Sequence, residues 1–251
     1  MIDMHTHILP RIDDGAKDST MSAFMLKKEA EQGVKTVVLT SHYYGRKHGP
    51  AHFLERRSAS FERIKDKIPE GMEVRLGAEV HFTGVNVAEH EELCKLAIEG
   101  TKYILIEFPF TEKWTYELLD KLAEFIGETG YTPIIAHVER YREVQKRPAY
   151  LSELIEMGCL LQVNTQAFLN KRDKKLAYAL LKKGMVHCIG TDTHDMDARA
   201  PIYAEAENAV KDAGYEAEWD KIQENMAKIL SGEEVKANPP QALKKFFGKY
   251  L

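Results

Sequence analysis

Short apolar or β-branched runs alternate with longer amphipathic stretches along the whole chain. This alternation is typical of βα units around a parallel sheet, because such strands are buried on both faces while each helix buries only one. The pattern predicts seven strands, near residues 2–8, 36–42, 74–80, 103–108, 133–139, 160–165 and 186–192. A sequence of this kind predicts an α/β fold with a parallel sheet.

The first helical pattern covers residues 19–32. Asp18 and Ser19 are both suitable N-caps, and Gly33 stands where a helix commonly ends with a left-handed residue. Charged residues fill the side that we expect to face water. The apolar stripe that we expect to face the core consists of Met21, Phe24, Met25 and Leu26.

Glycine recurs between a predicted helix and the strand that follows it. The four instances are Gly33, Gly130, Gly158 and Gly184. A turn from helix to strand needs a left-handed residue, which glycine adopts without steric cost. This repetition is structural and not a binding motif, and it favours a regular barrel.

The last stretch, about 199–250, carries helical patterns only. Pro239 and Pro240 predict a break before a short final helix, because proline cannot continue a helix. No linker or low-complexity segment interrupts the sequence. We therefore expect one domain covering residues 1–251.

Composition excludes some classes of partner. The chain has 251 residues, 44% hydrophobic and 29% charged, with a formal net charge of -4, and its pI is about 6.2. No general basic field is available to hold a polyanion, so nucleic acid is not expected as a partner. The start at Met1 has no signal-peptide pattern, and no apolar run approaches the roughly 20 residues that span a bilayer. The sequence predicts a cytoplasmic protein without membrane insertion.

Three cysteines, Cys94, Cys159 and Cys188, are widely separated and form no C-x-x-C pair. They predict neither a disulfide framework nor a thiolate zinc site, and we expect small buried side chains. The pair His187-Cys188 resembles the start of the H-C-x5-R loop of cysteine-dependent phosphatases. The residue six positions after Cys188 is His194 and not arginine, so the thiol mechanism is excluded by spacing.

Side chains able to bind a metal end most of the predicted strands. His5 and His7 lie two apart on the first strand and therefore share a face. The later strands end in His42, Glu79, Glu107, His137, Asp192 and His194. One such residue alone is more often a hydrogen-bonded structural group. Six of seven strand ends together indicate one site at the carboxyl end of the barrel.

Buried carboxylates facing one another are costly unless cations neutralise them. A divalent cation resolves that cost and also organises the imidazoles. Because the donor set combines histidine with carboxylate and contains no sulfur, it suits manganese, zinc or iron better than copper or an iron–sulfur cluster.

The same motifs carry a specific resemblance. They are similar to the PHP (polymerase and histidinol phosphatase) superfamily over nearly the whole chain. The strings at residues 1–8, 13–15, 40–42, 77–79, 106–108, 136–141 and 192–194 more closely resemble the bacterial manganese-dependent protein-tyrosine phosphatases of capsule and exopolysaccharide operons. This resemblance implies a distorted (β/α)7 TIM-like barrel, the PHP fold, with up to three divalent ions. Manganese is the implied metal, and iron, zinc or magnesium are possible occupants.

The resemblance also implies which residues bind each metal. The ligands of the first metal would be His5, His7, Glu79 and Asp192. Those of the second would be Glu79 as a bridge, Glu107 and His137. Those of the third would be Asp14, His42 and His194.

The first loop leaves a choice between Asp13 and Asp14. Superfamily members commonly have a histidine there, whereas this chain has two aspartates before Gly15, as the tyrosine-phosphatase branch does. We favour Asp14 because it directly precedes the glycine, and we expect Asp13 to cap the following turn. His81, two residues after Glu79, is expected at the rim of the same site.

Arg140 and Arg199 match the phosphate-facing arginines of that branch. A guanidinium can donate hydrogen bonds to two phosphoryl oxygens at once, which makes arginine well suited to binding phosphate. The alternative interpretation is a surface salt bridge. We favour the phosphate-binding role for both because of their positions after His137 and His194.

The function implied is hydrolysis of protein phosphotyrosine, with a hydroxide bridging two cations as the nucleophile and no covalent intermediate. The implied substrate is the tail of a bacterial tyrosine autokinase that regulates capsule and exopolysaccharide synthesis. A histidinol-phosphate phosphatase or other small-molecule phosphomonoesterase is the alternative enzyme, while the acidic pI counts against a nuclease. A non-catalytic scaffold stabilised by bound metal is the alternative outside enzymology. No general acid is assigned.

Overall fold

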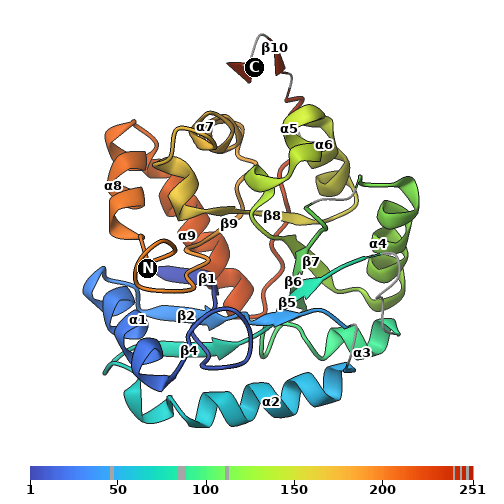
Figure 1. Cartoon of the computed structure of the whole chain (residues 1–251). Coiled ribbons are helices and arrows are strands. Elements are labelled where there is room, and N and C mark those ends of the chain that lie inside the picture. The colour runs from blue at the N-terminus through green and yellow to red at the C-terminus, as the bar shows by residue number, and fades with distance from the viewer. Residues whose placement is uncertain are drawn as a thin grey trace.

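The computed structural model describes residues 1–45, 48–83, 89–110, 113–239, 241–243, 245–246 and 249–250. A curved layer of parallel strands occupies the centre, and helices surround it on the outside (Figure 1). The strands of this layer are β1 (Ile2–Thr6), β2 (Thr36–Leu39), β3 (His42–Tyr43), β4 (Glu73–Leu76), β5 (Glu79–His81), β6 (Tyr103–Glu107), β7 (Thr132–Ile135), β8 (Leu160–Asn164) and β9 (Cys188–Gly190).

All seven predicted strands are present, but two of them are interrupted. Hydrogen bonding links β1, β2 and β4 in one sheet and β3, β5, β6, β7, β8 and β9, in that order, in another. The predicted strand 36–42 is therefore divided into β2 and β3, and the predicted strand 74–80 into β4 and β5. At the break, the backbone N–H of Glu79 lies 3.0 Å from the oxygen of Thr40 and 3.1 Å from that of Ser41. This irregular pairing is a local kink of the bulge type, which redirects the strand ends.

The first and last strands meet, so the layer curls back on itself. Asp192, just after β9, donates its backbone N–H to the oxygen of His5 at 2.8 Å. In turn, the N–H of His7 donates to the oxygen of Thr193 at 2.9 Å. These bonds extend the parallel contact between β1 and β9 beyond the strands themselves. The fold is the predicted distorted (β/α)7 barrel.

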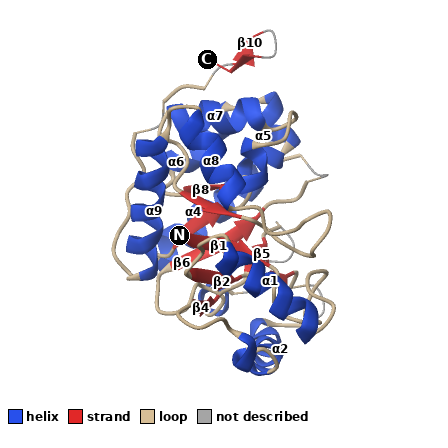
Figure 2. Cartoon of the chain, turned by 90° about the vertical axis from the view of Figure 1, so that its left-hand side faces the viewer, coloured by secondary structure: helices blue, strands red, loops and turns tan. Residues whose placement is uncertain are grey.

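The helices form the outer layer, as Figure 2 shows from the side. They are α1 (Ser19–Glu31), α2 (Pro50–Glu62), α3 (His90–Cys94), α4 (Tyr116–Thr129), α5 (Arg142–Lys146), α6 (Ala149–Glu156), α7 (Lys174–Lys182), α8 (Ala204–Asp212) and α9 (Glu216–Leu230). Short 3-10 helices cover Lys65–Lys67, Val138–Arg140 and Thr165–Phe168. In the described part of the chain, no helix is both long and apolar enough to cross a membrane.

The structure confirms the predicted ends of helix α1 but not its predicted buried face. The Asp18 side chain caps it by accepting from two backbone N–H groups, and Gly33 follows it with φ of 85°. Phe24, placed in the apolar stripe by sequence, is 58% exposed. The buried face consists of Ser22, Met25, Leu26 and Glu29. Those positions follow i, i+3, i+4 and i+7 spacing, and Phe24 lies about 150° around the helix from the centre of that face.

The chain end differs from the prediction as well. Residues expected to form a short final helix include the antiparallel pair β10 (Lys245–Phe246) and β11 (Lys249–Tyr250). Pro240, one of the two prolines expected to mark the break, lies outside the described residues. Gly248 stands between two aromatic-rich runs in the sequence, which is a hairpin signal that the helical interpretation overlooked.

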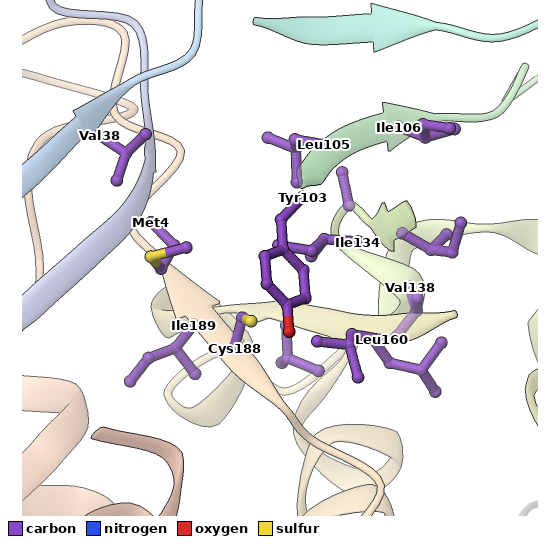
Figure 3. Close-up of a cluster of buried hydrophobic side chains, with 14 of the residues drawn as sticks. Met4, Val38, Tyr103, Leu105, Ile106, Ile134, Val138, Leu160, Cys188 and Ile189 are labelled. Carbon is purple, nitrogen blue, oxygen red and sulfur yellow. The ribbon is translucent and has the colours of Figure 1, made fainter. Parts of the chain in front are cut away.

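Apolar side chains fill the centre of the layer. Figure 3 shows Met4, Leu105, Ile134 and Cys188, which come from four different strands, gathered in one cluster. Such packing supports the strand ends rigidly, because protein interiors are nearly as dense as organic crystals. Cys188 is fully buried and burial raises the pKa of its thiol, so it is an inert core residue, as expected.

Candidate metal centre

Nine side chains named from the sequence meet at the carboxyl end of the strands. They are His5, His7, Asp14, His42, Glu79, Glu107, His137, Asp192 and His194. Eight of them are almost inaccessible to water, and Asp14 alone keeps a largely exposed side chain, at 64%. The bends at the ends of β2 and β4 help to assemble the group, because they make His42 and Glu79 neighbours in the β3–β5 register.

The H-x-H pair forms the most buried corner of the site. The Nε2 atoms of His5 and His7 lie 3.0 Å apart. Glu79 Oε2 is 3.3 Å from each of these nitrogens. Asp192 Oδ1 is 3.5 Å from His5 Nε2 and 3.4 Å from His7 Nε2. Four donor atoms therefore converge from β1 and the residue after it, from β5 and from the segment after β9.

Glu79 divides its two oxygens between different partners. Oε1 lies 2.8 Å from His137 Nε2, which is also 3.4 Å from an oxygen of Glu107. Oε2 faces the H-x-H pair and lies 2.9 Å from His42 Nδ1. A carboxylate with this orientation can contact two adjacent cations at once.

A third group of donors lies at the open side. Asp14 Oδ1 is 3.4 Å from the Nε2 atoms of both His42 and His194. The donor atoms of His7, Asp14, His42 and His194 all lie within 4.8 Å of one another. The neighbouring His194 ring lowers the pKa of Asp14 to about 2, so this carboxylate is charged at neutral pH.

Asp13 caps the turn of the first loop, as expected, and supports two neighbouring groups of the site. Its Oδ1 accepts from the N–H of Gly15 at 3.0 Å and thereby caps the turn. Its Oδ2 accepts from His7 Nδ1 at 2.9 Å and from the backbone N–H of His42 at 3.0 Å. A carboxylate hydrogen-bonded to the far nitrogen of an imidazole fixes the ring and its tautomer.

The donor set fits divalent cations. Burial would raise the pKa of Glu79, but nearby His5 and His42 hold it well below its ordinary value. Its Oε2 and the ring nitrogens His42 Nδ1 and His194 Nε2 are buried without a hydrogen-bond partner in the described residues. Although Oε2 and His42 Nδ1 are close, they are not aligned as a hydrogen bond. Converging, unaligned lone pairs of nitrogen and oxygen are suited to metal binding.

The backbone around the site is strained and tightly packed. His137 and Asp192 have positive φ angles of 33° and 53°, a backbone conformation that residues other than glycine rarely adopt. A Cβ on Gly190 would lie 2.5 Å from that of His5, and one on Gly15 would lie 2.1 Å from the backbone oxygen of His7. Only glycine fits at these two positions.

Arg140 and Arg199 both anchor on Asp192. Arg140 Nη1 donates to Oδ2 and Arg199 Nη2 donates to Oδ1, each at 2.8 Å. Their side chains remain 36% and 34% exposed, and both line a cavity of about 370 Å³ together with candidate ligands. The acid that they contact is a buried residue of the site and not a surface partner. Each guanidinium is therefore held on one side and open to the cavity on the other.

The predicted strand without a ligand-type end supplies two amides that sequence reasoning missed. Gln162 Oε1 accepts from the N–H of His137 at 2.7 Å and lies 3.3 Å from His5 Nδ1. Its amide nitrogen donates to Asn164, whose own amide nitrogen donates to Asp192, each at 2.9 Å. Their spacing by two on one strand was the available signal, because it places both on one face.

Two further residues border the site. Glu139 is buried, and burial raises its pKa to about 7. His81 Nδ1 lies 3.1 Å from Glu107 Oε2, and its side chain lines the same 370 Å³ cavity, which is the rim position expected from sequence.

Comparison with known proteins decides the family. Residues 1–231 match the family described as "Capsular polysaccharide synthesis, CpsB/CapC". The chain belongs to the CpsB/CapC family.

Known phosphatases are similar in sequence to this chain over almost its full length. The chain is 33% identical to "Tyrosine-protein phosphatase YwqE" of Bacillus subtilis, with 99% of each chain covered. It is 31% identical to "Tyrosine-protein phosphatase CpsB" of Streptococcus agalactiae, over 92% of this chain and 98% of the relative. A crystal structure from a study of YwqE and Streptococcus pneumoniae CpsB, described as "unique metal-dependent tyrosine phosphatases", superposes with a TM-score of 0.83 at 30% identity. The match covers 98% of this chain and all of that one. The CpsB/CapC fold is thus retained throughout.

Proposed function

We propose that this protein is a metal-dependent protein-tyrosine phosphatase. Its full-length similarity to the phosphatases of B. subtilis and S. agalactiae supports this activity. The observation that carries the proposal is the placement of Arg140 and Arg199 beside the candidate ligands in one open cavity. A buried metal site that only stabilised the barrel would not need two cationic side chains facing solvent beside it.

The nine converging side chains are the proposed ligands, with manganese as the proposed metal and iron, zinc or magnesium as alternatives. Bound divalent cations supply Lewis acidity, which generates a nucleophile from water and offsets phosphoryl charge. Glu79 is the proposed bridging ligand, because its two oxygens face different groups. Asp13 holds the His7 ring in place, and Gln162 and Asn164 hold His137 and Asp192.

The arginines bind the substrate phosphate in this proposal. Asp192 fixes both guanidinium groups, so little conformational entropy is lost when phosphoryl oxygens bind. Phe110 lines the same cavity and offers an apolar surface to a phenyl ring. The leaving tyrosinate has a reference pKa of about 10, well below that of an alkyl alcohol, so its departure does not require a strong general acid.

The natural substrate that we propose is a tyrosine-phosphorylated protein of capsule or exopolysaccharide synthesis, specifically a bacterial tyrosine autokinase acting in the cytoplasm. The family description supports the association with capsular polysaccharide. Histidinol phosphate or another small phosphomonoester is the alternative substrate, and a scaffold without turnover is the alternative role.

Initial rates on a phosphotyrosine peptide and on histidinol phosphate separate these possibilities. The protein is stripped with a chelator and assayed with and without added manganese, and His5→Ala serves as the ligand-deficient control. We expect the peptide to be hydrolysed only with metal and only by the unaltered protein. Faster hydrolysis of histidinol phosphate would make a small phosphomonoester the substrate in place of a phosphotyrosine protein. Metal binding without hydrolysis of either compound would favour the scaffold.

A further inference from the structure

A second, strongly basic groove adjoins the candidate metal centre. It has a volume of about 430 Å³ and is lined by Phe110, Lys113, Arg140, Arg142, Glu143, Lys146 and Arg172. Five of these seven residues are cationic and one is acidic, whereas the whole chain carries a net charge of -4. The groove is thus locally positive although the chain as a whole is negative, which favours an anionic ligand.

Internal ion pairs do not neutralise the groove. Lys146 pairs with Glu143 at 2.9 Å, and Arg172 lies 3.4 Å from an oxygen of Asp173. Within the described residues, Lys113 and Arg142 form no ion pair with an acidic side chain. Glu112, which precedes Lys113 in the sequence, is outside the described residues. Among the described residues, Lys113 and Arg142 are therefore the groove cations without an acidic partner.

The groove is continuous with the site through shared residues. Phe110 and Arg140 line both the basic groove and the cavity that contains the candidate ligands. The Arg140 guanidinium stacks on Phe110, with its carbon 4.8 Å from the ring centroid. Arg142 and Lys146 begin and end α5, and their spacing of four places them on one side of that helix. A peptide leaving the cavity over Phe110 would enter the groove within a few residues, since extended chain advances about 3.3 Å per residue.

We infer that this groove binds an anionic side chain that flanks the phosphotyrosine in the substrate. The inference rests on the proposed phosphatase function and adds a preference among phosphotyrosine sequences. The anion is the carboxylate of aspartate or glutamate or the phosphate of a second phosphotyrosine, because either suits a group of exposed arginine and lysine side chains. Neutral or basic flanking residues lack this attraction.

Peptides of one length, differing only beside the phosphotyrosine, test the preference. One carries glutamate on both sides, one glutamine and one lysine, and a fourth carries a second phosphotyrosine. We expect kcat/KM for the glutamate peptide to exceed that of the glutamine peptide by about five- to tenfold at low salt, mainly through KM. The advantage should shrink at high salt, because exposed charges are screened. The second phosphotyrosine peptide, compared with the glutamate one, distinguishes the two anion sources.

The double variant Arg142→Gln/Lys146→Gln removes two charges from the groove without changing a proposed ligand. It should lose most of the preference for glutamate and keep its rate on the glutamine peptide and on para-nitrophenyl phosphate. The matched control is Lys27→Gln/Lys221→Gln, which removes two exposed charges from α1 and α9, away from α5 (Figure 1).

Equal kcat/KM for the glutamate and glutamine peptides would overturn the groove proposal and leave the phosphatase activity intact. A preference retained by the groove variant, or lost equally in the control, would also overturn it. Failure to hydrolyse any phosphotyrosine peptide with metal bound would instead refute the proposed function, and the groove proposal with it.

Discussion

Asn164 donates its side-chain amide to Asp192 Oδ2 at 2.9 Å, and the same oxygen accepts from Arg140 at 2.8 Å. Asp192 also has a positive φ of 53°, so its position depends on such external support. Strand β8, which carries no candidate ligand, thus holds the candidate ligand Asp192 in place. Residues that orient a metal ligand through hydrogen bonds also tune the affinity for the metal.

We expect Asn164→Ala to weaken metal binding by about 10- to 100-fold while the protein stays folded. The remaining amide, Gln162, would keep its bond to the backbone of His137, so the barrel itself is retained. Calorimetric titration of the chelator-stripped variant with manganese measures the affinity, and circular dichroism confirms the fold. Asn208→Ala, an exposed amide on α8, is the control and should bind metal like the unaltered protein. Equal affinities for the two variants would show that Asn164 does not support the site.

Alanine substitution of the adjacent Asp13 and Asp14 should have different effects, on folding stability for Asp13 and on bound metal for Asp14. Asp13 makes three hydrogen bonds in a buried position, so Asp13→Ala should lower the unfolding free energy of metal-free protein by about 1–3 kcal/mol. Asp14 is largely exposed, so Asp14→Ala should change that stability by less than about 0.5 kcal/mol but reduce the metal bound per chain. Denaturant unfolding and elemental analysis measure the two effects. The reverse pattern would assign the ligand role to Asp13.

Substitution of Arg140 or Arg199 should affect phosphate binding more than folding. Arg199→Gln removes one guanidinium but leaves the candidate ligands, so we expect kcat/KM on a phosphotyrosine peptide to fall about 10²- to 10³-fold. Inhibition by inorganic phosphate should weaken in parallel, which a mere folding defect would not cause. Arg63→Gln, at the exposed end of α2, provides a control with the same chemical change. A normal phosphate inhibition constant in Arg199→Gln would contradict the assigned role.

Much of the fold followed from local patterns, because strand burial and helix periodicity are properties of short segments. The glycines before strands and the cap at Asp18 were predicted on the same basis and are confirmed. The breaks in two strands were not predicted. A continuously apolar run such as the one ending at Leu39 looks the same whether the strand is straight or bent, since the bend depends on pairing with two different sheets.

The candidate site was predictable to the extent that ligand-type residues recur at strand ends. The supporting amides were not found, because glutamine and asparagine within a strand are common and carry no chemical signature of their own. The buried face of α1 was predicted incorrectly for a related reason: Glu29 was counted as a solvent-facing charge, although it is fully buried. Only the tertiary contact with β1 and the segment after β9 explains that position.

Glu29 and Asp3 form a buried acidic pair beside Thr191. The Thr191 hydroxyl lies 2.6 Å from Asp3 Oδ2 and 3.3 Å from Glu29 Oε1. One hydroxyl proton cannot satisfy both carboxylates, and Glu29 Oε2 has no partner among the described residues. Burial raises the pKa of Asp3 to about 6, and burial together with the charge of Asp3 raises that of Glu29 well above its ordinary value.

This pair should make the metal-free protein less stable as pH rises. A raised carboxyl pKa in the folded state stabilises the fold fully below the unfolded pKa, near 4, and that contribution is lost as pH rises through about 6 for Asp3 and higher for Glu29. Glu29→Gln keeps the side chain neutral, so it should raise the unfolding free energy at pH 8 by about 1–3 kcal/mol and flatten the pH dependence. Denaturant unfolding of chelator-stripped protein from pH 5 to 8 measures both effects. Glu31→Gln, an exposed acid on the same helix, should leave the pH profile unchanged. Parallel profiles for Glu29→Gln and the unaltered protein would mean that the pKa of Glu29 is not raised in the fold.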